Sequence, residues 1–176
     1  MADLQRARVG VIGGSGLYSI PGLRQVEERA IKTPFGAPSD ELRLGELEGV
    51  QTVFLARHGR HHQLLPSEVP YRANIWAMRS LGVRWLISLS AVGSLQGHLQ
   101  PRDMVVPDQF IDRTRDRPAS FFGNGCVAHV SLADPFCPNL SALLADAAEQ
   151  GLSLIHISEP TRRRGSAYAG VGLEKK

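Results

Sequence analysis

Residues 53–62 read Val-Phe-Leu-Ala-Arg-His-Gly-Arg-His-His, so an apolar stretch typical of a buried strand runs directly into a cluster of guanidinium and imidazole groups. Ligands of α/β proteins bind at the ends of such strands. Arginine matches phosphate oxygens in a bidentate way, and histidine adds a donor that can be charged or neutral near pH 7. The stretch therefore predicts a strand followed by an anion-binding loop, with a solvated basic loop as the alternative.

Apolar stretches on both sides of this loop predict alternating strands and helices. Strands are expected at 8–13, 24–32, 41–47, 50–56, 83–90 and 104–111, and helices at 70–81 and 140–150. The two strands of 41–56 are expected to form a hairpin that turns at Glu48-Gly49. This order predicts an α/β domain with a mixed sheet flanked by helices.

Three loops, at 13–16, 56–62 and 90–94, each follow an apolar strand. If these strands are neighbours in the sheet, the loops converge at one of its edges. The glycines of 13–16 allow a sharp turn that turns backbone N–H groups toward a ligand. Backbone amides, hydroxyl groups and a guanidinium would then surround one anion.

The last 25 residues differ in character from the rest of the chain. All eleven residues of 152–162 match one reading frame of a transposase-based sequencing adapter. We therefore predict that residues 1–151 belong to a folded domain and that 152–176 are a non-native, disordered tail. This tail has five basic and two acidic residues, so it accounts for the whole net charge of +3 and leaves 1–151 neutral. A neutral domain favours a small anion over nucleic acid or an anionic membrane as the ligand.

Other features exclude further classes of protein. No apolar run is long enough to span a bilayer, and the first residues contain no apolar signal sequence. Cys126 and Cys137 are too few and too far apart for a zinc knuckle, and we expect them to be reduced thiols in the cytoplasm. His61 and His62 do not form a metal site on their own, because adjacent side chains of an extended chain point in opposite directions.

The segments taken together resemble the purine nucleoside phosphorylases, and specifically the 5′-methylthioadenosine phosphorylases, over nearly all of residues 8–150. The segment 108–114 is the most specific part of the match. The matching pieces are Gly10-Val-Ile-Gly-Gly-Ser-Gly16, Thr33-Pro-Phe-Gly36, Leu55-Ala-Arg-His-Gly-Arg60, Tyr71-Arg-Ala-Asn-Ile-Trp-Ala77, Gly93-Ser94, Asp108-Gln-Phe-Ile-Asp-Arg-Thr114 and Asp134-Pro-Phe-Cys-Pro138.

This resemblance implies phosphorolysis of 5′-methylthioadenosine to adenine and 5-methylthioribose 1-phosphate, as part of purine and methionine salvage. It implies phosphate as co-substrate, no cofactor, no metal and a homotrimer when the protein is full length. It places His129 near the sugar and thioether end of a substrate bound by a neighbouring subunit. Arg60, His61 and His62 are expected either at the rim of the site or among the residues that support its ligands, and no residue is assigned as catalytic. The phosphate-binding positions implied by the resemblance are Ser15, Arg57, His58, Ser90 and Ala91, with serine at 15 and 90 where many relatives have threonine.

Several alternatives remain open. Chains of this family continue well past residue 151, and the later portion carries the groups that bind ribose and purine, so the chain as written is expected to be inactive. The base could therefore be a 6-oxopurine, as in methylthioinosine. A dinucleotide-binding oxidoreductase is disfavoured because Ser19 stands where a third glycine belongs, and a non-catalytic anion-binding module is the remaining class. Among single residues, Ser15 could satisfy a turn, Arg57 an ion pair, and His129 could be a half-buried structural histidine.

Overall fold

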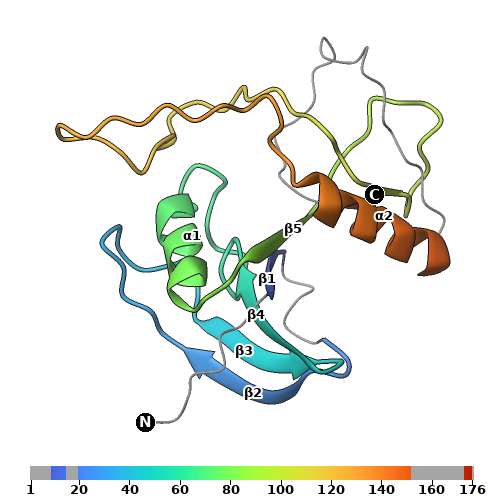
Figure 1. Cartoon of the computed structure of the whole chain (residues 1–176), viewed down its shortest axis with the longest axis horizontal. Helices are drawn as coiled ribbons and strands as arrows, with labels where there is room; N and C mark the ends of the chain where they lie inside the picture. Colours follow the sequence, from blue (N-terminus) through green and yellow to red (C-terminus); the bar gives the residue numbers. More distant parts are fainter. Residues whose placement is uncertain (1–8, 15–19, 152–172, 176) are drawn as a thin grey trace. The chain divides into compact units, whose positions relative to one another are not determined.

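The computed structural model describes residues 9–14, 20–151 and 173–175 (Figure 1). The described residues form two compact units. The first runs to Ile87 and includes Asp116–Phe121, and the second consists of Ser88–Arg115 and the described residues from Phe122 onward. Strand β5 (Trp85–Ala91) begins in the first unit and ends in the second.

The first unit contains four neighbouring strands in the order β2-β3-β4-β1. These are β1 (Val9–Gly13), β2 (Arg24–Arg29), β3 (Leu42–Leu47) and β4 (Val50–Ala56). β1 runs parallel to β4, with Val9 opposite Thr52 and Gly13 opposite Ala56. β2 and β4 both pair with β3 in antiparallel fashion. The sheet is therefore mixed, as the alternation of elements predicts.

The hairpin of β3 and β4 turns at the predicted dipeptide. Glu48 has a φ of 47° and Gly49 a φ of 78°. Positive φ at both central residues defines the type I′ turn, whose twist matches that of the flanking strands. Leu47 then pairs with Val50, which sets the register of the whole hairpin.

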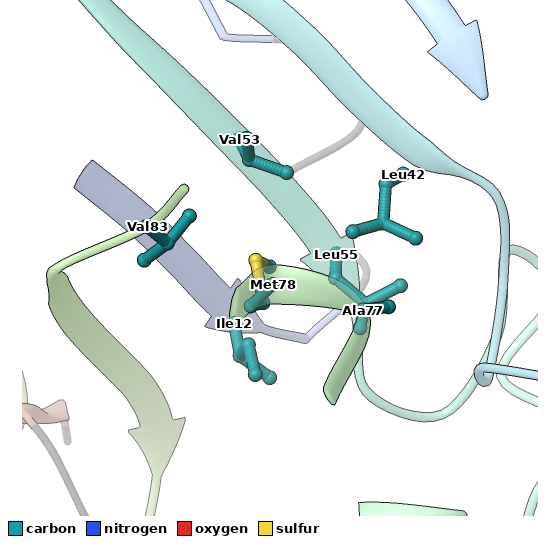
Figure 2. Close-up of a cluster of buried hydrophobic side chains, with 7 residues drawn as sticks. All are labelled: Ile12, Leu42, Val53, Leu55, Ala77, Met78 and Val83. Carbon is teal, nitrogen blue, oxygen red and sulfur yellow. The ribbon is translucent and has the colours of Figure 1, made fainter. Parts of the chain in front are cut away.

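Helix α1 (Tyr71–Ser80) covers the first unit's sheet and ends where Gly82 predicts. Gly82 has a φ of 88°. The Gly82 N–H donates to the Arg79 carbonyl and the Val83 N–H to the Met78 carbonyl, which is the Schellman pattern of helix ends. The apolar face of α1 packs on β1, β3 and β4 (Figure 2). The core there consists of Ile12, Leu42, Val53, Leu55, Ala77, Met78 and Val83.

Trp76 is not a core residue, although its aromatic ring suggests burial. The buried face of α1 consists of Ala73, Asn74, Ala77 and Met78. Trp76 lies outside this face and remains 36% exposed. Helical geometry therefore overrides the apolar character of this side chain.

The second unit contains the end of β5, β6 (Met104–Val105), α2 (Pro138–Gly151) and β7 (Leu173–Lys175). The strand expected at 104–111 is only two residues long, because Pro107 has no N–H for a ladder. The spacing of Leu140, Leu143 and Leu144 suggests that Leu143 lies on the buried face of α2, but it is 65% exposed, whereas Ala145 and Ala148 are buried. The buried face of α2 is thus rotated about the helix axis, away from the face that its leucines suggest.

β7 departs from the expectation that residues 152–176 lack regular structure. It pairs in parallel with β5, with Leu89 opposite Leu173 and Ala91 opposite Lys175, and it is antiparallel to β6. An open strand edge presents unpaired N–H and C=O groups that any extended segment can satisfy. Of the helices described, neither has the length and apolar character needed to cross a membrane.

Candidate phosphate-binding site

Arg57 lies immediately after β4, at the point where the strand meets β1. Its backbone N–H donates to the Gly13 carbonyl at 2.8 Å, so the β1–β4 pairing continues one step beyond Ala56. The bond places the first residue of the glycine-rich turn beside the basic loop, as convergence of strand ends predicts. Ser15 lies outside the described residues, and its role in binding phosphate stays a prediction.

The side chains of Arg57 and His58 form a hydrogen-bonded pair. Arg57 Nε donates to His58 Nε2 at 3.2 Å. His58 Nδ1 lies 2.8 Å from the Leu64 carbonyl oxygen, which can only accept, so Nδ1 carries the proton. His58 Nε2 is then the acceptor of the hydrogen bond from Arg57. Both residues are half-buried, which limits competition from water.

The loop around His58 is closed by its own backbone. The Gly59 N–H donates to the Ala56 carbonyl, and the N–H groups of Gln63 and Leu64 both donate to the His58 carbonyl. Gly59 has a φ of 77°, and a Cβ there would lie 3.2 Å from the Ser39 carbonyl oxygen. Glycine is thus favoured at this position by its positive φ and by the close approach of Ser39.

Ser39 connects this loop to α1. Its hydroxyl donates to the Ala56 carbonyl at 2.7 Å, and its N–H donates to Asn74 Oδ1 at 2.8 Å. Asn74 is only 2% exposed, so its side-chain amide lies in the protein interior. The end of β4 is consequently fixed from the side of the helix as well as from β1.

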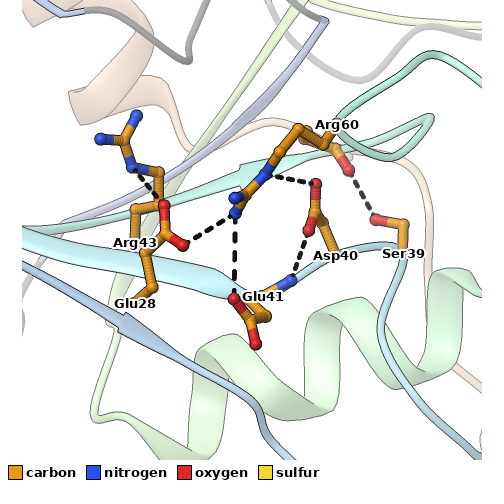
Figure 3. Close-up of polar contacts among 7 residues, drawn as sticks. Glu28, Ser39, Asp40, Glu41, Arg43 and Arg60 are labelled. Atoms are coloured by element: carbon orange, nitrogen blue, oxygen red, sulfur yellow. Dashed lines mark hydrogen bonds and ion pairs between the residues drawn. The ribbon is translucent and has the colours of Figure 1, made fainter.

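Arg60 faces three carboxylates (Figure 3). Its guanidinium lies 3.1 Å from Glu28, 3.7 Å from Asp40 and 3.9 Å from Glu41. The hydrogen bond to Glu28, followed by the charge of Asp40, raises the pKa of Arg60 above its ordinary value. Glu28 also pairs with Arg43 at 3.4 Å. Arg60 is thus part of an ion-pair network, and its expected position at the rim of the site or among the supporting residues stays a prediction.

The two remaining histidines of the loop are exposed. His62 stacks on His58, with ring centroids 4.6 Å apart and an interplanar angle of 28°. His62 has a φ of 53°, which turns the chain back toward Gly59. In the part of the chain that the structure describes, no three His, Cys, Asp or Glu side chains are grouped in a way that could hold a metal ion.

Ser90 and Ala91 are the last two residues of β5, opposite Glu174 and Lys175 of β7. They belong to the second unit, and their contact with phosphate stays a prediction. His129 is exposed, between Val127 at 77% and Val130 at 74% exposure. The alternative of a half-buried structural histidine is therefore wrong, and its role near a substrate stays a prediction.

Sequence reasoning missed the residues that support the loop: Glu28, Ser39, Asp40, Glu41 and Asn74. Contacts between residues as distant in sequence as Arg60 and Glu28 leave no local pattern. Asn74 is the exception, because a polar residue on the apolar face of a predicted helix indicates a buried hydrogen bond.

A mixed α/β sheet with an arginine–histidine loop beside a glycine-rich turn is the arrangement expected of an enzyme domain that binds an anion. The chain belongs to the phosphorylase superfamily, whose family model matches residues 8–168. This confirms the family resemblance drawn from the sequence motifs. The match extends beyond Gly151, so the domain boundary at that residue and the non-native origin of 152–176 stay predictions.

Known proteins similar to the chain are S-methyl-5′-thioadenosine phosphorylases. The Prochlorococcus marinus enzyme is 64% identical over 146 residues, which are 83% of this chain and 46% of that protein. The Geobacter sulfurreducens enzyme is 56% identical over 91% of this chain and 54% of its own length. The chain thus spans about half the length of the curated relatives that it matches.

Solved structures confirm the fold. A methylthioadenosine phosphorylase from an Antarctic soil metagenomic library matches with a TM-score of 0.80 and 52% identity, over 86% of this chain and 54% of that one. The Schistosoma mansoni enzyme in complex with adenine matches with a TM-score of 0.77 and 42% identity, over 82% and 54%. The mixed sheet with flanking helices is therefore that of the nucleoside phosphorylases.

Proposed function

We propose that this chain supplies the phosphate-binding half of an enzyme that cleaves 5′-methylthioadenosine with inorganic phosphate. The products are adenine and 5-methylthioribose 1-phosphate. The observation that carries this proposal is the Arg57–His58 pair at the junction of β4 and β1, where Arg57 is tied to Gly13. The names of the relatives support the substrate, and phosphate is the only co-substrate that this chemistry needs.

In this reaction a phosphate oxygen forms a bond to C1′ of the ribose. The glycosidic bond to adenine breaks, and its electron pair leaves with the base, which takes up a proton. Positive charge develops on the sugar in the transition state, as in other glycosidic cleavages. Phosphate is both nucleophile and counter-charge to that cation, so its position determines the rate.

The geometry of the pair suits this role. A guanidinium presents its N–H groups in a planar fork that matches two phosphate oxygens. His58 accepts a hydrogen bond from Arg57 Nε at 3.2 Å, which orients the guanidinium. Serine hydroxyls at 15 and 90 and the backbone of Ala91 are proposed to complete the phosphate site.

We extend the proposal to the assembly and the cell compartment. His129 is exposed among exposed apolar residues, which supports its reaching a substrate of a neighbouring subunit in a homotrimer. Cys126 and Cys137 are free and exposed. Such thiols favour the reducing cytoplasm as the place of action.

Phosphate titration of the chain tests the phosphate site directly. Arg57→Met keeps the length of the side chain and removes hydrogen bonds to a charged ligand, which are worth about 2 kcal/mol, or roughly thirtyfold in affinity. Arg79→Met, an exposed arginine of α1, is the control and should bind as the wild type does. Equal phosphate affinity in the two variants would refute the site.

Adenine release tests the reaction and the base. The chain alone is expected to bind phosphate without releasing adenine, because it spans only about half of its relatives. A chimera of residues 1–151 with the C-terminal half of the Prochlorococcus marinus enzyme should release adenine from methylthioadenosine only with phosphate present. Faster release of hypoxanthine from methylthioinosine would favour the 6-oxopurine alternative.

A further inference from the structure

We propose that Arg60 is a positioning residue, which holds the loop of residues 57–62 so that Arg57 and His58 face phosphate. The inference rests on the proposed function. Among the described residues, the ion pairs of Arg60 are with carboxylates and not with a candidate phosphate-binding residue. It acts through its carboxylate partners Glu28, Asp40 and Glu41, which belong to other segments of the first unit.

The network of Arg60 attaches the loop to two separate places in the sheet. Glu28 is in β2, and it also contacts Arg43 of β3, its partner in the strand register. Asp40 and Glu41 lie in the connector that leads into β3 (Figure 3). Guanidiniums and carboxylates alternate along this network, which fixes several side chains together more firmly than an isolated exposed ion pair does.

The same connector reaches the other end of the loop. Ser39 precedes Asp40, and its hydroxyl donates to the carbonyl of Ala56, the residue before Arg57. The backbone of residues 56–60 is therefore held at both ends by 39–41. His58 lies midway, and its ring is held by the Leu64 carbonyl and by Arg57.

The two arginines of the loop, Arg57 and Arg60, have different surroundings. Three carboxylates surround Arg60, and their negative charge would repel a phosphate dianion from that position. The carboxylates around Arg60 therefore favour an anchoring role for Arg60, whereas Arg57, which donates to His58, is the residue proposed to bind phosphate.

Two measurements on the 176-residue chain test this role. Phosphate affinity is measured by calorimetry, and the His58 imidazole is observed by nitrogen-15 NMR without phosphate. Arg60→Met should weaken phosphate binding roughly three- to tenfold, the scale expected for a modest coupling within a network. It should also change the His58 signals, because the Nδ1–Leu64 hydrogen bond loses its support. Arg60→Lys should restore both readouts in part.

Arg29→Met is the matched control. Arg29 pairs with Glu27 at 2.7 Å on the exposed side of β2, so the variant removes the same charge from the same unit. It should leave both readouts unchanged. Asp40→Asn should reproduce part of the Arg60→Met effect, and the two substitutions together should be less than additive.

Different failures point to different errors. If Arg60→Met weakens phosphate binding without changing the phosphate-free His58 signals, Arg60 contacts phosphate directly and the positioning role is wrong. If Arg60→Met behaves as Arg29→Met does in both readouts, the network has no part in the site. If the wild-type chain does not bind phosphate, the proposed function fails, while the His58 signals still decide whether Arg60 positions the loop.

Discussion

Gly10 lies in β1 opposite Val53, where the strand approaches α1 and the residues that follow it. A Cβ at this position would lie 2.8 Å from Val83 Cγ1, 3.1 Å from Met78 Sδ and 3.2 Å from Leu86 Cδ1. Val83 cannot rotate away easily, because its branched side chain is stiff and only 6% exposed. Gly10→Ala should therefore strain the core by about 2 kcal/mol, which lowers the melting temperature of a unit of this size by roughly 8–16 °C.

Thermal unfolding followed by circular dichroism measures this change. Gly14→Ala is the control, because a Cβ there meets nothing within 4 Å. Val83→Ala alone leaves a cavity and should destabilise by about 2 kcal/mol. In the double variant the new methyl enters that cavity, so the loss should be at least about 1 kcal/mol smaller than the sum of the two. A neutral Gly10→Ala, or strictly additive losses, would refute the packing argument.

Two further predictions concern the segments outside the site. The Arg72 guanidinium lies 5.0 Å from the centre of the Phe35 ring and donates to the Ser120 carbonyl at 3.4 Å. Arg72→Ala should therefore loosen residues 116–121 and speed trypsin cleavage after Arg115 several-fold. An unchanged cleavage rate would contradict this docking. On α2, Ala145→Lys should destabilise the second unit by about 2–4 kcal/mol because it buries a charge, whereas Leu143→Lys should be nearly neutral. Equal melting temperatures of these two variants would show that the buried face of α2 is misassigned.

The sequence predicts the elements whose signals are local. The hairpin follows from Glu48-Gly49, because a type I′ turn favours glycine at a position of positive φ. The end of α1 follows from Gly82, which adopts the left-handed conformation that closes a helix. The basic loop also follows β4 as the sequence predicts, and its first residue, Arg57, lies beside Gly13.

What the sequence did not predict depends on partners distant along the chain. Leucine spacing suggests a face of α2 that includes Leu143, but the surface against which a helix packs decides which stripe is buried. Arg60 has the same residue type as Arg57, yet it lies among acidic side chains from β2 and the 39–41 connector, which the sequence around it does not predict. No local periodicity carries this information.

The hydrogen bond from the Arg57 N–H to Gly13 gives the molecule an internal reporter. Exchange of this amide with deuterium requires the ends of β1 and β4 to separate, so its rate measures how often the glycine-rich turn parts from the basic loop. An anion that bridges the two segments would slow that separation. Protection of a single backbone proton would then follow occupancy of the site, without any label on the ligand.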